Sequence, residues 1–324
     1  MSVGDPEIVV SAAAAGPGSI DAPSPEIAAA KIQGRSPWRL AFERLRSDKA
    51  AVLCAVVIVL IVLMAIFAPL FRLITGHPPN QQYFDTGLTL DGQPKAPNGT
   101  FWLGSDDVGR DVLVRIAYGA RVSLIVGVVA TFLTVTIGTL VGLAAGYFGK
   151  MVDTILARII DVMLSIPFLL FAISLASIFH AGLKVVIFVL AIFSWSSVAR
   201  IVRGQVLSIR EREYVEAARA MGAGSWRIMI IDILPNVIAP IIVYTTLLIP
   251  VSIVGEATLS FLGVGIQPPT ADWGQMIADA QGNYHAWWFL VFPSLALLVT
   301  TLAFNIFGDG VRDAFDPRSD RMFN

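Results

Sequence analysis

The chain has 324 residues, of which 56% are hydrophobic and 15% are charged, and its mean hydropathy is +0.72. Soluble domains carry roughly 25% charged residues, so this composition excludes an ordinary soluble protein and predicts an all-α membrane protein. The formal net charge of -1 argues against a nucleic-acid partner, and one cysteine with three scattered histidines argues against a disulfide or a metal site.

The N-terminal 33 residues are rich in Ala, Pro, Gly and Ser, and their first basic residue is Lys31. They lack the basic start of a secretory signal, so we expect residues 1–33 to be a disordered cytoplasmic tail. Residues 34–49 predict an amphipathic helix that Ser36 caps, with Trp38 and Phe42 on its apolar face. This helix fits the membrane interface, where it would contact lipid, and packing on a soluble partner is the alternative.

Membrane spans are predicted from runs without charge, because a helix needs roughly 20 apolar residues to cross the hydrocarbon. Six such runs occur within residues 50–318. The fourth is short and is extended past Arg200, because an arginine at the end of a span can reach the interface. The predicted spans cover residues 50–71, 122–146, 162–179, 185–205, 236–255 and 286–308, and residues 319–324 form a C-terminal tail.

Lysine and arginine predict the orientation of these spans. Most of the 23 basic residues fall on the same side of the membrane as the N-terminus. The loop of residues 256–285, on the opposite side, has none. Because cytoplasmic loops are enriched in Lys and Arg, both termini are expected in the cytoplasm. The long first loop opposes this assignment, since it would place five basic residues outside: Arg72, Lys95, Arg110, Arg115 and Arg121.

Within the second predicted span, Gly138, Gly142 and Gly146 recur every four residues. Glycines at this spacing line one helix face and allow another helix to approach closely. The pattern predicts tight helix packing, either within this chain or against another subunit.

The sequence lacks motifs that are typical of nucleotide binding or catalysis. The nearest approach to a phosphate-binding loop is AAGYFGKM, in which Ala144 and Met151 replace the required glycine and hydroxyl residue. No nucleophile motif or metalloprotease motif occurs, so we expect neither an enzyme nor a cofactor on this chain. A secondary transporter is an alternative, although the predicted spans hold no carboxylate that could bind a coupling ion.

A polar insert, EAARAMGAGSWRIMIIDILPN, separates the fourth and fifth spans. Residues 211–221 favour a helix that Gly222 ends, and Ser225 would cap a second helix that stops at Pro235. The small side chains of Ala217 and Ala218 would let a partner approach. The alternative is a helix that rests on its own membrane domain.

The pattern E-A-A, three residues, G and then L-P resembles the cytoplasmic loop of ABC importer permeases, with Asp232 where that family usually has an apolar residue. Further segments resemble the C-type membrane subunit of oligopeptide and dipeptide ABC importers, and the resemblance covers Gly34 to Arg318. These segments are LGSDDVGRDVLVRIAYGARVSLIVG, AGYFGKMVD, ARIVRGQVLSIREREYVEAARAMGA, LSFLGVGIQPPTADWG and FNIFGDGVRDAFDPR.

The resemblance implies a type I ABC importer permease in the cytoplasmic membrane of a bacterium. Its partners would be a second permease, two ATPase subunits or domains that bind ATP and Mg, and an extracytoplasmic peptide-binding protein. Peptide is the implied substrate, and glutathione and nickel are alternatives because their importers share these motifs. The implied coupling residues are Glu216, Ala217, Ala218, Arg219, Gly222, Leu234 and Pro235, and Gly263, Pro268, Pro269 and Trp273 would belong to an extracytoplasmic gate or binding-protein contact.

Overall fold

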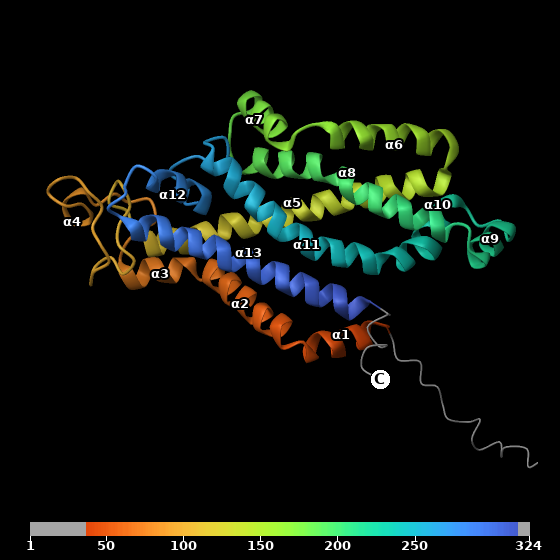
Figure 1. Cartoon of the computed structure of the whole chain (residues 1–324), viewed down its shortest axis with the longest axis horizontal. Helices are drawn as coiled ribbons and strands as arrows, with labels where there is room; N and C mark the ends of the chain where they lie inside the picture. The colour runs from red at the N-terminus through yellow and green to blue at the C-terminus, as the bar shows by residue number, and fades with distance from the viewer. Residues whose placement is uncertain (1–36, 317–324) are drawn as a thin grey trace, which may run out of the picture. The chain divides into compact units, whose positions relative to one another are not determined.

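The structure is a computed structural model that describes residues 37–316. These residues form helices and loops, with no strand beyond two isolated bridges (Figure 1). The predicted tails, 1–33 and 319–324, and the predicted cap Ser36 lie outside this range. The helices are α1 (Pro37–Ser47), α2 (Lys49–Ile66), α3 (Ala68–Thr75), α4 (Phe84–Gly87), α5 (Val112–Phe148), α6 (Lys150–Ser165), α7 (Phe168–Phe179), α8 (Leu183–Ile209), α9 (Glu213–Ala220), α10 (Ser225–Arg227), the π-helix η1 (Ile228–Ile233), α11 (Leu234–Phe261), α12 (Trp273–Ala280) and α13 (Trp287–Phe315).

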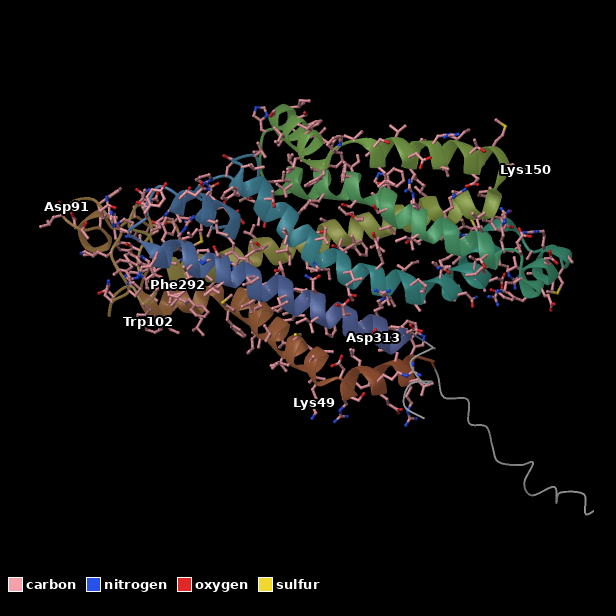
Figure 2. The ribbon with its side chains drawn as sticks, viewed as in Figure 1. Lys49, Asp91, Trp102, Lys150, Phe292 and Asp313 are labelled. Atoms are coloured by element: carbon pink, nitrogen blue, oxygen red, sulfur yellow. The ribbon has the colours of Figure 1, made fainter. Side chains whose placement is uncertain are left out.

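Five helical segments of the described chain are long and apolar enough to cross a membrane, and the bent pair α6–α7 makes a sixth. Short helices lie at the two ends of this bundle. One end carries α4 and α12 and is called the α12 end; the other carries α1, α9 and α10 and is called the α9 end (Figure 1). Figure 2 places Asp91 and Trp102 at the α12 end and Lys150 and Asp313 at the α9 end.

The first predicted span, 50–71, is broken in the structure. Helix α2 ends at Ile66, and α3 starts at Ala68 with Pro69 in its first turn. Arg121 of α5 donates from Nε to the Ala65 carbonyl at 2.5 Å and from Nη2 to the Ile66 carbonyl at 2.8 Å. A side chain from another helix therefore satisfies carbonyls that the break leaves unpaired.

Helix α5 is longer than the predicted span 122–146. It begins at Val112, where the Asp111 side chain accepts from the Val114 amide at 3.2 Å. The extra turns include Arg115, which is buried with its Nε 3.4 Å from Asp106 Oδ2. A charge-free count excluded these turns, but an arginine can be buried when a carboxylate pairs with it.

The glycines of α5 pack on α8 of the same chain. A Cβ at Gly138 would lie 2.5 Å from Val198 Cβ, and one at Gly142 would lie 2.7 Å from the Ala199 carbonyl oxygen. Gly146 meets Val206 in the same way. Of the two expected uses of this glycine face, the structure places it in packing within the chain.

The third predicted span, 162–179, is not one straight helix. Helix α6 ends at Ser165, α7 begins at Phe168, and their axes differ by 89°. Ile166, which precedes Pro167, has an extended backbone (φ -82°, ψ 127°). Proline disfavours the helical conformation at the residue before it, so the chain turns here.

The last three spans extend beyond their predicted bounds. Helix α8 passes Arg200, as expected, but continues to Ile209 rather than residue 205. Helix α13 reaches Phe315 rather than residue 308. Residues Ser225–Phe261 form one continuous helical segment, whereas the predicted fifth span was 236–255.

Candidate coupling surface

Helix α9 lies in the polar insert between α8 and the long Ser225–Phe261 segment. Glu213 and Glu216 occupy its first turn and Arg219 its last, which is the charge distribution that complements a helix dipole. Residue Arg212, before the helix, has an extended backbone. The sequence therefore favours a helix that begins at Glu213 and ends within two turns.

Gly222 ends α9 in a Schellman motif. Its amide donates to the Arg219 carbonyl at 3.0 Å, and the Ala223 amide donates to the Ala218 carbonyl at 3.0 Å. The φ of Gly222 is +81°, a conformation that glycine adopts without strain. The predicted helix stop at Gly222 thus has a defined hydrogen-bonded geometry.

The inner face of α9 packs against its own chain. Val215 and Ala218 are buried and belong to one hydrophobic cluster with Ile228 and Ile233 of η1. The predicted alanine pair is therefore divided, because consecutive helical residues point about 100° apart. Of the two alanines only Ala217 is exposed, so Ala218 contributes to folding rather than to a partner contact.

The outer face of α9 and the adjoining turn expose large apolar side chains. Trp226 is 67% exposed, Met221 81% and Tyr214 43%. Glu216 and Ala217 are also exposed. We call Tyr214, Glu216, Ala217, Met221 and Trp226 the coupling surface. Sequence reasoning missed its three large apolar members, although an aromatic residue within a polar insert is itself a signal of an interface.

Arg219 is exposed but interacts with another helix of the chain. Its guanidinium lies 5.9 Å from the ring centroid of Tyr147, near the end of α5. Arg210 of the α8–α9 connection donates from Nη1 to the Gly146 carbonyl at 2.9 Å. Both arginines therefore attach the insert to the end of α5, and these contacts stabilise its position at the α9 end of the bundle.

Leu234 and Pro235 are not part of the coupling surface. They begin α11, and Pro235 lies in its first turn without ending the helical segment. The preceding turn widens into the π-helix η1, and the Asn236 side chain donates to the Asp232 carbonyl at 2.7 Å. Proline has no amide to donate, and the wider turn accommodates it within the helical segment. The expected helix stop at Pro235 was wrong, and Ser225 starts the segment without a side-chain cap.

The residues predicted for the outer gate separate into two groups. Gly263, Pro268 and Pro269 are exposed in the α11–α12 loop. Trp273 is fully buried, and its Nε1 donates to the Ile116 carbonyl at 3.0 Å. Trp273 is therefore a core residue of the α12 end and not a contact for a partner.

Charged side chains are also buried at the α12 end. Arg110 donates from Nε to Asp106 Oδ2 at 2.5 Å, and its Nη2 lies 3.5 Å from Asp107 Oδ1 and 3.8 Å from Asp279 Oδ2. Burial and the neighbouring Asp106 and Asp279 raise the pKa of the Asp107 carboxyl above its ordinary value, although Arg110 opposes this effect. No group of three or more potential metal ligands occurs among residues 37–316.

Glu256 corrects the expectation that the spans hold no carboxylate. The predicted fifth span ended one residue before it, but α11 continues to Phe261 and buries Glu256 completely. A charge-free count cannot find such a residue, because the count stops at the first charge.

Comparison with known proteins places the chain in a family. The model for "Binding-protein-dependent transport system inner membrane component" matches residues 138–321, and the model for the N-terminal TM domain of oligopeptide transport permease C matches residues 36–91. A dipeptide transport permease of Alkalihalophilus pseudofirmus is 40% identical over 87% of this chain and 90% of its own. An oligopeptide transport permease of Bacillus subtilis is 41% identical over the same shares. A glutathione transport permease of Pectobacterium atrosepticum is 39% identical over 88% of this chain and 92% of its own.

A solved structure supports the fold. A chain of the MetNI methionine ABC transporter, in an inward-facing conformation, aligns with a TM-score of 0.52 at 22% identity and covers 63% of this chain and 96% of its own. The chain therefore belongs to the family of inner-membrane permeases of binding-protein-dependent ABC importers, in the branch of oligopeptide and dipeptide permeases, and is a multi-pass transport subunit rather than an enzyme.

Proposed function

We propose that this chain is one of two permease subunits of a peptide importer and that α9 couples it to an ATPase subunit. Its partners are a second permease, two ATPase subunits or domains that bind ATP and Mg, and an extracytoplasmic peptide-binding protein. ATP-driven closure of the ATPase pair moves the docked helices, and the permeases change from an inward-open to an outward-open state.

One observation carries this proposal. The coupling surface exposes Glu216 on α9, Met221 at its end and Trp226 on α10, and α9 packs against the rest of the chain. Aromatic residues and methionine are enriched at protein interfaces, and a charged residue at the rim can add a hydrogen bond. Because η1 joins this region to α11 without a break, force applied at α9 is transmitted to a membrane-spanning helix.

The test removes exposed anchors without changing the buried face. Trp226→Ala and Glu216→Lys should weaken docking by about 1 to 3 kcal/mol each, the usual range for an interface anchor or a charged hydrogen bond. In proteoliposomes with the partner subunits and the binding protein, both variants should reduce uptake and the stimulation of ATP hydrolysis by loaded binding protein. Co-purification shows whether the ATPase subunits are retained.

The matched control is Trp102→Ala, which removes a tryptophan of similar exposure (54%) at the α12 end. It should leave retention of the ATPase subunits unchanged. Normal uptake and normal stimulation in both Trp226→Ala and Glu216→Lys would overturn the coupling assignment.

Peptide is the proposed substrate, because relatives named dipeptide and oligopeptide permeases match over most of the chain. Glutathione is the second candidate, since glutathione permeases match with similar identity. Competition distinguishes them: unlabelled peptides should block uptake of a labelled peptide, whereas stronger inhibition by glutathione would favour the alternative. Membership of the family contradicts the secondary-transporter alternative.

A further inference from the structure

Two carboxyl groups meet in the interior of the α12 end. Glu256 lies in the last turns of α11, and Asp272 is the N-cap residue of α12. Both are fully buried, and the start of α12 packs on α11 beside Glu256, since a Cβ at Gly274 would overlap the Ala257 carbonyl oxygen. This packing brings the Asp272 side chain into hydrogen-bonding reach of Glu256. The loop 262–272 connects the two residues, so their contact closes this loop on itself.

Hydroxyl groups surround Glu256. Ser123 of α5 donates to its Oε2 at 3.0 Å, and Ser260 donates to its Oε1 at 3.0 Å. Ser260 Oγ also accepts from the Ile266 amide of the loop at 3.0 Å. Asp272 Oδ2 accepts from the Gln275 amide at 3.0 Å, but the buried Oδ1 receives no donor from another group.

The charged groups of the surrounding helices point elsewhere. Arg115 of α5 contacts Asp106 and the Pro269 carbonyl, and Asp279 of α12 faces Arg110. Lys184 at the start of α8 is exposed. The charged residues of α13 are at its opposite end: Asp309, Arg312 and Asp313. Within the described chain, no base forms an ion pair with Glu256 or Asp272.

Two adjacent buried carboxylates cannot both be ionised, because each is desolvated and each repels the other. A hydrogen bond between two carboxyl groups also requires a proton on one of them. A proton held by Glu256 supplies the donor that Asp272 Oδ1 lacks. One proton thus removes one buried charge and satisfies one buried acceptor.

We propose that Glu256 and Asp272 share one proton, and that this acid–carboxylate pair is a latch that holds loop 262–272 against α11 and α5. The latch positions the loop that carries Gly263, Pro268 and Pro269 on its exposed side. Loss of the proton leaves two negative charges at one buried position, and the loop opens to hydrate them. The proposal does not depend on the coupling role of α9.

Infrared spectroscopy tests the shared proton directly. In D₂O at neutral pH the wild-type protein should show the carbonyl stretch of a protonated carboxyl that Glu256→Gln lacks. Any other protonated carboxyl is common to both proteins and cancels in the difference spectrum. If the wild type and Glu256→Gln give identical spectra in this region, the proposal is wrong. Two ionised carboxylates around a bound cation would give that result.

Hydrogen exchange tests the latch. After correction for intrinsic exchange, amides of residues 262–272 should lose protection in the wild type as the pH rises, by about tenfold per pH unit for one released proton. Glu256→Gln keeps a donor at every pH and should show no such loss. Asp161→Asn, which changes an exposed carboxylate of α6, should respond as the wild type does.

Asp272→Asn provides a second variant if Glu256→Gln does not accumulate. Asparagine still caps α12, but the pair can no longer exchange a proton between two carboxyls, so the pH response should disappear. Wild-type pH dependence in either variant would contradict the latch.

Discussion

Gly142 is one of the residues at which α5 and the backbone of α8 approach closely. A Cβ there would lie 2.7 Å from both the Ala199 carbonyl oxygen and Val202 Cβ. Backbone atoms of a packed helix cannot move without displacing neighbouring turns, so even a methyl group must separate the helices. The contact therefore depends on the absence of a side chain.

We predict that Gly142→Ala lowers the free energy of unfolding by about 1 to 3 kcal/mol, the usual cost of overpacking. Thermal unfolding of the purified protein in detergent measures this. Gly204→Ala on α8 is the matched control, because its Cβ meets nothing within 4 Å. It should be neutral or stabilising by up to about 1 kcal/mol, since alanine favours a helix. Equal melting temperatures for the two variants would contradict the assigned packing.

The sequence predicted only part of the candidate site at this scale. Glu216, Ala217 and Gly222 are exposed as expected, because helix propensity and a glycine stop are local signals. Which face of α9 is buried could not be predicted, since that depends on where η1 lies. For this reason Ala218 was assigned to the partner contact, and Trp226 was overlooked.

At the scale of elements, α6 is held to α8 by two ion pairs of different exposure. Arg203 makes a two-point contact with Asp153, with Nη2 2.8 Å from Oδ2. Arg200 contacts Asp161 through Nη2 at 2.7 Å. The side chains of the first pair are 29% and 19% exposed, and those of the second are 55% and 54% exposed.

Double-mutant cycles should separate these pairs. Removing Asp153 and Arg203 singly and together to alanine should give a coupling energy of about 1 kcal/mol, because the pair is partly desolvated and bidentate. The same cycle on Asp161 and Arg200 should give roughly 0 to 0.5 kcal/mol, since exposed pairs contribute little. Thermal unfolding measures both cycles, and a larger value for the exposed pair would contradict this ranking.

The prolines show why the boundaries of the helices were harder to predict than the number of helices. Pro167 separates α6 from α7 and Pro69 opens α3, whereas Pro235 lies within a continuous helical segment. The outcome depends on the backbone before the proline: Ile166 is extended, whereas Leu234 keeps a helical conformation after the turn widens into η1. The residue pattern alone did not reveal this wider turn.

For the whole molecule, the structure gives partners within the chain to three of the five basic residues that oppose the proposed orientation. Arg110 and Arg115 contact Asp106, and Arg121 donates to the carbonyls of the α2–α3 break. Arginines with such partners have structural roles, so they weigh less in an argument from charge. At the α9 end, Arg44 donates to the Asp316 carbonyl at 3.0 Å and joins α1 to the end of α13.

This orientation predicts which cysteines a membrane-impermeant thiol reagent can reach in intact cells. In a Cys54→Ala background, cysteines placed at Ser225 and Asp313 should be protected, because both lie at the proposed cytoplasmic end, although both are exposed. A cysteine at Thr270 should be labelled, since this exposed residue lies in the α11–α12 loop. Its neighbour Ala271 is only 4% exposed and serves as the buried control at the same end. All cysteines except that at Ala271 should react after the cells are permeabilised, and labelling of Ser225 in intact cells would reverse the proposed topology.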